Sequence, residues 1–223
     1  MREGQVKTTY GTGCFILQNV GEKPILSKNG LLGTVCYRIG DKTYYALEGA
    51  VEVAGAAISW AKSVGIITDT KQIEPEALSV SDCGDVYFVP AFGGLLSPHY
   101  RDDARGLLIG MSQNTERGHL MRAFIEAPCL RTAEVVQAMS SDAEKRVTKM
   151  AVDGGMTVNN LMMQTQSDLI NAEIVRKHEK EITSCGAAIA AGLQVGYWES
   201  LEALEQSIKT ERVFKPEKSH EWR

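Results

Sequence analysis

The order in which strand-like and helix-like patterns follow one another is the feature that most constrains this fold. In the first fifty residues the patterns are typical of strands, beginning with Cys14–Val20, an apolar stretch that ends in the turn residues Gly21-Glu22-Lys23-Pro24. Leu31–Ile39 and Thr43–Leu47 flank Gly40-Asp41-Lys42, which predicts a β-hairpin. The chain is therefore expected to begin a sheet from strands and hairpins before it forms its first helix.

Helices and strands alternate in the rest of the predicted order. Small and apolar residues recur at helical spacing from Glu48 to Val64, and a long helix is predicted from Asn114 or Thr115 to Met139, kinked at Pro128. The last third alternates strand, helix, strand and helix over Thr148–Val152, Asn159–Leu169, Glu173–Arg176 and Thr183–Tyr197. This order predicts an α/β chain in which helices cover a mixed sheet.

The remaining segments are less regular. Thr68–Gly84 is polar and predicts a surface connection, Val86–Val89 predicts a short buried strand, and Gly93–Gly106 predicts a loop. A final amphipathic helix is predicted over Ser200–Ile208, followed by a charged tail from Lys209 onward.

Charge and cysteine usage exclude several classes of partner. The 223 residues include 24 Lys and Arg against 28 Asp and Glu, a net charge of -4, which excludes nucleic-acid binding or polybasic membrane docking as the default interpretation. The uncharged run Ile182–Trp198 is shorter than the roughly 20 apolar residues of a membrane-spanning helix, so it predicts a buried helix. Five scattered cysteines without a CxxC pair predict reduced thiols in a cytoplasmic protein, with neither zinc nor disulfide bonds.

Two glycine-containing turns have the composition of phosphate-binding turns. In Gly11-Thr12-Gly13 the two glycines let the backbone approach an anion, and the threonine hydroxyl is able to donate to it. Asp153-Gly154-Gly155 follows a predicted strand and leads into the helix headed by Asn159-Asn160, where a ligand would lie beside a helix N-terminus. Ordinary turns with asparagine caps account for the same residues. From the residues alone, both interpretations stay open.

Residue spacing predicts no other catalytic chemistry. The four histidines have no second histidine at metal-ligand spacing, and His119 is expected to be a surface or capping residue. Asp102-Asp103 beside Arg105 predicts a solvated loop, and no Ser/His/Asp set can be assembled from chain order. Pattern and spacing therefore predict a cytoplasmic mixed α/β domain, with nucleotide binding as one interpretation.

A series of short motifs, taken in order along nearly the whole chain, resembles the glycerol kinases of the FGGY carbohydrate kinase family. The motifs are Thr9-Tyr10-Gly11-Thr12-Gly13-Cys14-Phe15, Gly21-Glu22-Lys23-Pro24, Asn29-Gly30-Leu31-Leu32, Tyr45-Ala46-Leu47-Glu48-Gly49, Val89-Pro90-Ala91-Phe92, Ala104-Arg105-Gly106, Asp153-Gly154-Gly155-Met156-Thr157-Val158-Asn159-Asn160, Leu161-Met162-Met163-Gln164 and Gly186-Ala187-Ala188. The tract Gly106–Glu126 also resembles the second FGGY signature, although Phe124 stands where a smaller residue is usual.

The resemblance implies the actin-like ATPase (ribonuclease H-like) fold, a mixed sheet with helices on both faces. Residues 1–223 are expected to be the C-terminal nucleotide-binding domain, without the N-terminal polyol-binding domain. By motif matching, the resemblance implies ATP-binding residues on three segments and one substrate-binding residue. The ATP-binding residues are Thr12, Gly13, Gly55, Ser59, Gly155 and Asn159, and the residue lining the polyol pocket is Phe15.

The implied activity is transfer of the ATP γ-phosphate to glycerol, with Mg²⁺, giving glycerol 3-phosphate. The family's catalytic aspartate lies upstream of the Tyr10 motif, so no catalytic residue and no metal ligand is named in this chain. The implied partners are ATP, glycerol and the missing domain, and a homo-oligomer is left open.

Two alternatives remain, namely another FGGY sugar or polyol kinase and a nucleotide-binding module that does not catalyse. Departures from the family pattern at Gly93, Pro128 and Arg131 leave the ATP-binding positions intact.

Overall fold

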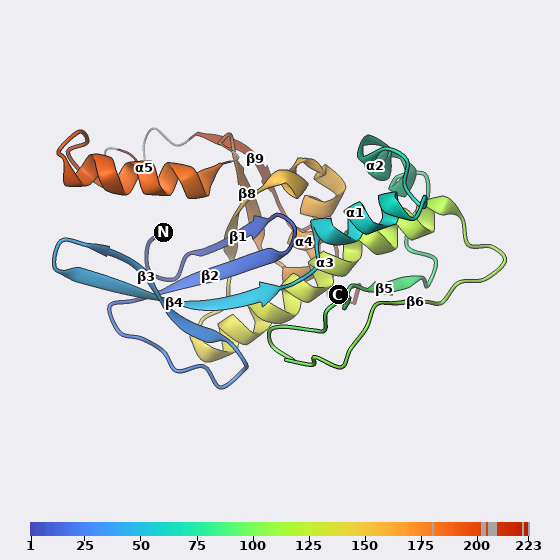
Figure 1. Cartoon of the computed structure of the whole chain (residues 1–223), viewed down its shortest axis with the longest axis horizontal. Coiled ribbons are helices and arrows are strands. Elements are labelled where there is room, and N and C mark those ends of the chain that lie inside the picture. Colours follow the sequence, from blue (N-terminus) through green and yellow to red (C-terminus); the bar gives the residue numbers. More distant parts are fainter. Residues whose placement is uncertain (180, 202–203, 205–208, 220, 223) are drawn as a thin grey trace.

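The computed structural model describes residues 1–179, 181–201, 204, 209–219 and 221–222. Its main feature is a mixed sheet, in which seven strands within these residues lie side by side (Figure 1). In their order across the sheet, the strands are β3 (Leu32–Ile39), β4 (Lys42–Val51), β2 (Cys14–Gly21), β1 (Val6–Tyr10), β7 (Lys149–Asp153), β8 (Glu173–Lys177) and β9 (Thr210–Phe214).

The sheet combines antiparallel and parallel pairs. β1 and β2 are joined by a tight turn, and β3 and β4 by another, so each pair is antiparallel. β7 lies parallel to both β1 and β8, and the crossover from β7 to β8 contains α4 (Asn160–Ile170). β1 is therefore the central strand that joins the antiparallel half of the sheet to the parallel half.

Two helices cover one face of this sheet. α3 (Arg117–Asp142) and α4 (Asn160–Ile170) pack against each other and against the strands. The Tyr10 hydroxyl of β1 donates to Oε1 of Gln166 at 2.7 Å, and the Cys129 thiol donates to the carbonyl of Met162 at 3.5 Å. The apolar core lies between this face and the two helices, and its largest fully buried side chains include Tyr10, Ile16, Phe124, Met139, Met150 and Met163.

The smaller elements lie beyond the main sheet. They are α1 (Gly55–Ser63), the short helices η1 (Thr70–Gln72) and η2 (Gly155–Val158), α2 (Ile73–Ala77), α5 (Ile182–Gln194) and a two-stranded sheet of β5 (Tyr87–Val89) and β6 (Leu107–Ile109). Within the described residues, no helix combines the length and the apolar composition that a bilayer span requires.

The sequence predictions agree with most of this architecture. The mixed sheet with helices is confirmed, as are the β3–β4 hairpin, β2, β7, β8 and the two helices that follow β7 and β8. Asn159 caps α4, since its Oδ1 accepts a hydrogen bond from the Met162 amide at 2.8 Å. His119 is also confirmed as a capping residue, because its Nδ1 accepts from the Glu116 amide at 2.9 Å. The N-cap of α3 is Glu116, so the prediction of Asn114 or Thr115 was wrong.

The predicted helix from Glu48 is wrong over its first turns. Residues up to Val51 extend β4, where they pair with β2 from Cys14 onward, and α1 begins only at Gly55. The small residues that suggested helical spacing also satisfy the two-residue alternation of a strand, and the neighbouring strand edge decides between the two.

Two further segments contain structure that was not predicted. Thr68–Gly84 includes η1 and α2, and α2 buries Ile73 and Ala77 against α3. The charged tail contributes β9, which pairs antiparallel with β8 and buries Phe214. The predicted helix over Ser200–Ile208 falls mostly outside the described residues.

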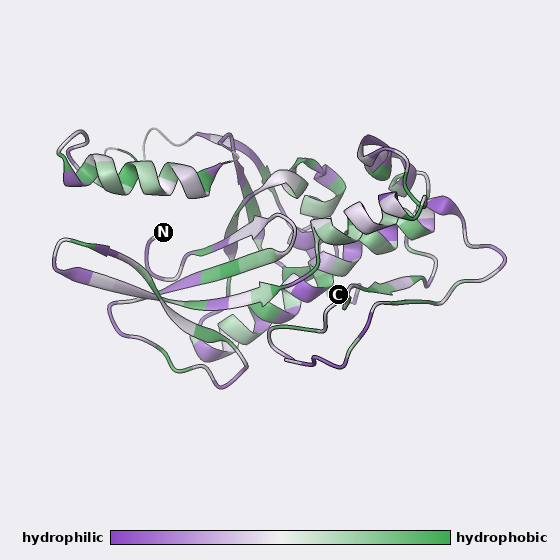
Figure 2. Ribbon diagram, viewed as in Figure 1, coloured by the Kyte–Doolittle hydropathy of each residue, from purple (hydrophilic) through white to green (hydrophobic). Residues whose placement is uncertain are grey.

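α5 forms where it was predicted, but it is not buried. Figure 2 shows its largely hydrophobic composition, and Figure 1 shows it apart from α3 and α4. Gly192 is its buried residue, covered by Trp198, whereas Gly186 would have open space around an added Cβ. The prediction from composition was wrong because apolar residues favour burial only where another element lies against them.

Candidate nucleotide site

The turn between β1 and β2 binds the start of α1 through its backbone. The amide of Ala54 donates to the carbonyl of Thr12 at 2.9 Å, the amide of Gly55 donates to that of Gly11 at 3.0 Å, and the amide of Ala56 donates to Thr12 at 3.0 Å. A helix start leaves such donors without partners, and here the turn accepts from them. These amides are therefore committed to the turn and are not available to an anion.

Glycine is required where these segments meet. A Cβ on Gly13 would lie 2.5 Å from the carbonyl oxygen of Val51, and a Cβ on Gly55 would lie 2.6 Å from that of Gly11. Both distances are far below van der Waals contact with backbone atoms that cannot move independently. The two positions therefore bring β4, α1 and the turn closer together than residues with side chains allow.

The turn after β7 joins the same cluster. Gly154 has φ +96° and ψ 165°, a conformation essentially restricted to glycine. A Cβ there would lie 2.4 Å from the Tyr10 carbonyl oxygen. The Met156 sulfur lies 3.5 Å from the Cβ position of Gly55, so η2 reaches α1 as well. The structure thus brings together three segments that lie far apart in the sequence.

The predicted ATP-binding residues lie on these three segments. Thr12 is exposed at the tip of the β1–β2 turn, and Ser59 is exposed one helical turn beyond Gly55. Gly155 is exposed, with nothing within 4 Å of its Cβ position. Asn159 uses Oδ1 as the cap of α4, and its Nδ2 amide supplies donors for a ligand.

Phe15 lies apart from the core. Its side chain is 52% exposed, on the sheet face opposite that of the buried Cys14. It pairs across the sheet with Thr9 of β1 and Ala50 of β4. A large aromatic residue on an open sheet face is suited to cover a ligand or another domain.

The ionisable groups around the turns favour binding over chemistry. Burial raises the pKa of Cys14 to about 12, so its thiol stays protonated. Asp153 is 3% exposed and forms an ion pair with Lys7, with 2.9 Å between Oδ2 and Nζ. The sequence analysis did not identify Lys7, whose polar side chain between the buried Val6 and Thr8 was the available signal.

The side chains around the turns do not form a metal-binding site within the described residues. Among the described residues, no three His, Cys, Asp or Glu side chains converge as metal ligands. The buried carboxylate beside the turns, that of Asp153, is already paired with Lys7. The described residues therefore do not supply a set of ligands for a metal ion.

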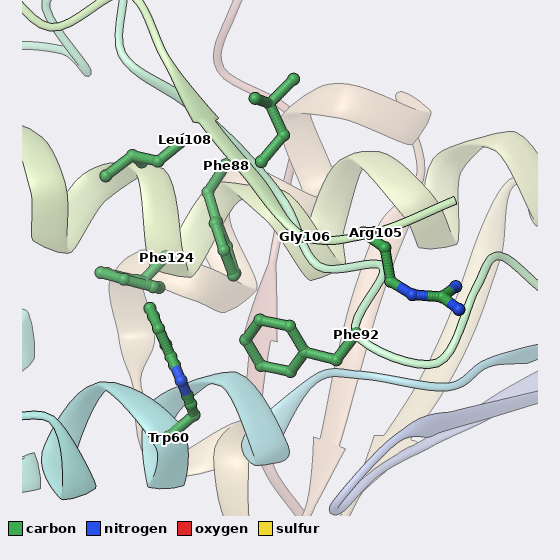
Figure 3. Close-up of a pocket in the computed structure, with 8 residues that line it drawn as sticks. Trp60, Phe88, Phe92, Arg105, Gly106, Leu108 and Phe124 are labelled. Atoms are coloured by element: carbon green, nitrogen blue, oxygen red, sulfur yellow. The ribbon is translucent and has the colours of Figure 1, made fainter. Parts of the chain in front are cut away.

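An aromatic pocket lies on the other side of α1. Figure 3 shows Trp60 of α1 directed toward Phe124 of α3, with Phe88 and Phe92 nearby. The ring centroids of Phe88 and Phe124 are 4.7 Å apart, and those of Trp60 and Phe92 are 5.1 Å apart. The hollow between these rings has a volume of about 220 Å³. Through Trp60, α1 makes ring contacts with Phe88, Phe92 and Phe124.

The relation to known proteins agrees with this geometry. The model of the FGGY family of carbohydrate kinases, C-terminal domain, matches residues 6–195. The chain belongs to this family. The curated glycerol kinase of Trichlorobacter lovleyi is 46% identical over 216 residues, which are 96% of this chain and 44% of that protein. That of Azorhizobium caulinodans is 46% identical over 225 aligned positions, covering 100% of this chain and 45% of the relative.

Solved structures of FGGY kinases have the same fold. A crystal structure of Plasmodium falciparum glycerol kinase with ADP matches with a TM-score of 0.92 and 40% identity, over 99% of this chain and 44% of that one. A ligand-bound xylulose kinase from Lactobacillus acidophilus has a TM-score of 0.82 at 20% identity, over 96% of this chain and 43% of that one, and it shows the fold alone. The chain spans less than half the length of the curated relatives that it matches.

Proposed function

We propose that this chain is the ATP-binding half of a kinase that transfers the γ-phosphate of ATP to glycerol. The observation that carries the proposal is the convergence of the β1–β2 turn, the start of α1 and the turn after β7, in a chain 40% identical to a glycerol kinase solved with ADP. Glycine backbone and open space at this junction suit the close approach of phosphate and purine.

Each segment has a distinct role in the proposal. Thr12 and Gly13 meet the phosphates, with the Thr12 hydroxyl as a donor, since the first amides of α1 are already bonded to the turn. Gly55 and Ser59 face the nucleotide from α1. Gly155 and Asn159 border the adenosine, and Phe15 covers the glycerol.

Catalysis requires groups beyond those assigned to this chain. Magnesium is proposed to enter with ATP, held by the phosphates, because the described residues supply no ligand cluster. We propose that an N-terminal domain outside these 223 residues supplies the base that accepts the glycerol proton. The same domain is proposed to supply most polyol-binding groups. A cytoplasmic location is proposed from the five free cysteines, and homo-oligomerisation stays a prediction.

Nucleotide binding is the first test of the proposal. Titration calorimetry of the 1–223 chain with ADP should give saturable binding, and Gly155→Leu should abolish it, because the new side chain fills the open space beside the turn. Gly186→Leu is the matched control, since Gly186 is exposed on α5 with nothing near its Cβ position. Absence of binding by the unmodified chain would refute the nucleotide assignment.

Reconstitution with the chain's own N-terminal domain tests the substrate, because that domain is proposed to supply most polyol-binding groups. The 1–223 chain should be inactive alone and should phosphorylate glycerol when it is joined to the domain encoded upstream of it. Activity of the joined protein toward a sugar but not toward glycerol would favour another FGGY kinase. ADP binding by the joined protein without any turnover would favour the module that does not catalyse.

A further inference from the structure

One buried arginine is hydrogen-bonded to the turn that is proposed to border the adenosine. Arg176 of β8 is 8% exposed, and its Nη1 donates to the carbonyl of Thr157 at 2.6 Å. The Thr157 hydroxyl in turn donates to the carbonyl of Gly154 at 2.7 Å. The guanidinium is thus hydrogen-bonded to η2, the segment between Gly154 and Asn159.

The other side of the guanidinium is fixed to β9. Nη2 of Arg176 donates to Oε1 of Glu211 at 3.0 Å, and the guanidinium carbon lies 5.4 Å from the centroid of the Phe214 ring. The arginine therefore links η2 to two adjacent strands of the main sheet. A planar guanidinium can make both contacts in fixed directions, whereas a lysine ammonium is a flexible point charge.

Stability alone does not account for this arrangement. Burying a charge is costly, and a buried ion pair often contributes no more than apolar residues of similar volume. Within the part of the chain that the structure describes, the buried Nε of Arg176 has no hydrogen-bond acceptor, which adds to that cost. The contact that distinguishes this residue is the one to the Thr157 carbonyl.

We propose that Arg176 is a positioning residue of the nucleotide site. Its guanidinium holds the Gly154–Asn159 turn in the conformation that receives the adenosine, without touching the nucleotide. This inference rests on the proposed function, because it presumes that the turn binds adenosine.

A second buried arginine supplies a matched control. Arg131 of α3 is also 8% exposed, its Nη2 donates to the Ser97 carbonyl at 2.8 Å, and it forms an ion pair with Glu134. It has the same kinds of partners as Arg176, but it serves a different loop. Replacement of either arginine should therefore cause similar structural damage.

The test compares ADP affinity and thermal stability for Arg176→Lys and Arg131→Lys in the 1–223 chain. Both variants should melt at lower temperature. Measured by calorimetry well below both melting temperatures, Arg176→Lys should bind ADP about tenfold more weakly, equivalent to about 1.4 kcal/mol, and Arg131→Lys within about twofold of the unmodified chain. Glu211→Gln, which keeps the arginine but removes its ionic partner, should weaken binding about threefold.

Other outcomes overturn the inference in distinguishable ways. Equal ADP affinity for Arg176→Lys and the unmodified chain, or equal weakening by both lysine variants, contradicts a positioning role while leaving the proposed function standing. If Arg176→Lys does not fold, an ADP affinity of Glu211→Gln equal to that of the unmodified chain contradicts the positioning role. Failure of the unmodified chain to bind ADP removes the proposed function itself, and this inference falls with it.

Discussion

Helix α1 contacts two regions of the protein that are packed by different means. Its first turn meets the β1–β2 turn through Gly55 and Gly11, with backbone against backbone. Its next turn carries Trp60, which packs with Phe92 and Phe124 behind the helix. We call the junction of the β1–β2 turn, Gly55 and the turn at Gly154-Gly155 the glycine region. We call the cluster of Trp60, Phe88, Phe92 and Phe124 the aromatic region.

The glycine region leaves a surface open for a ligand, whereas the aromatic region stabilises the position of α1. In the glycine region, hydrogen bonds between main chains fix the geometry, and the absence of side chains leaves an exposed surface at Thr12 and Gly155. In the aromatic region, stabilisation comes from apolar area removed from water and from ring contacts. Mutations in the glycine region should therefore affect nucleotide affinity as well as stability, whereas mutations in the aromatic region should lower stability and leave nucleotide affinity nearly unchanged.

The largest effect is expected at Gly154. Gly154→Ala should lower the free energy of unfolding by roughly 3 kcal/mol or more, since a side chain is strained at φ +96° and its Cβ would overlap the Tyr10 carbonyl. Urea denaturation measures this loss. The neighbouring Gly155→Ala is the control and should stay within about 0.5 kcal/mol of the unmodified chain, because its Cβ position is open. Equal stability of the two variants would contradict the account of the glycine region.

Trp60→Ala probes the aromatic region. The substitution should cost about 2 kcal/mol of stability, less than a fully buried tryptophan, because the side chain is 39% exposed. ADP affinity, measured by calorimetry, should change less than about twofold, because the turn still holds the start of α1. A large loss of affinity would show instead that the aromatic rings position the nucleotide site.

Gly55→Ala tests the contact between α1 and the turn. Alanine favours a helix by up to about 1 kcal/mol over glycine, but here its Cβ would lie 2.6 Å from the Gly11 carbonyl. We expect a net loss of about 1 kcal/mol in urea denaturation. Gly186→Ala, in open space on α5, should instead stabilise the chain slightly. Stabilisation by both substitutions would show that the turn yields to a side chain.

The smallest effect concerns Glu126, a carboxylate on α3, the helix that also carries Phe124. Burial raises the pKa of Glu126 above its ordinary value of 4.5, although Arg122, at 3.8 Å, and Cys83 act to lower it. A raised folded-state pKa favours the protonated form, so this contribution to stability is complete below about pH 4.5 and is lost as pH rises through the raised pKa. Relative to Glu126→Gln, the unmodified chain should lose less than about 1 kcal/mol between pH 4 and pH 7, by urea denaturation. If the difference in free energy of unfolding between the two proteins does not change with pH, the raised pKa of Glu126 is contradicted.

Much of the fold could be predicted because its signals are local. The β3–β4 hairpin has its turn residues between two strand patterns, and α4 begins at an asparagine whose side chain caps it. The motifs at Thr12 and Gly155 indicate the family and two segments of the candidate site from residues that are adjacent in the sequence. These features depend on residues within a few positions of one another.

The misassigned elements depend on distant partners. Val51 is in a strand because β2 lies beside it, and the charged residues before Phe214 form β9 because β8 has a free edge there. Arg176 gave no signal within β8, since its partner Thr157 belongs to another segment. The exposed surface of α5 likewise follows from where its neighbours lie.

The sequence by itself determined the mixed α/β class, the family and the glycines of the candidate site. Only the tertiary structure decided that Gly13, Gly55 and Gly154 meet at one junction, and that a buried arginine supports one of its turns. Turn and cap preferences act over a few residues, whereas close approach between segments depends on how the whole sheet and its helices pack.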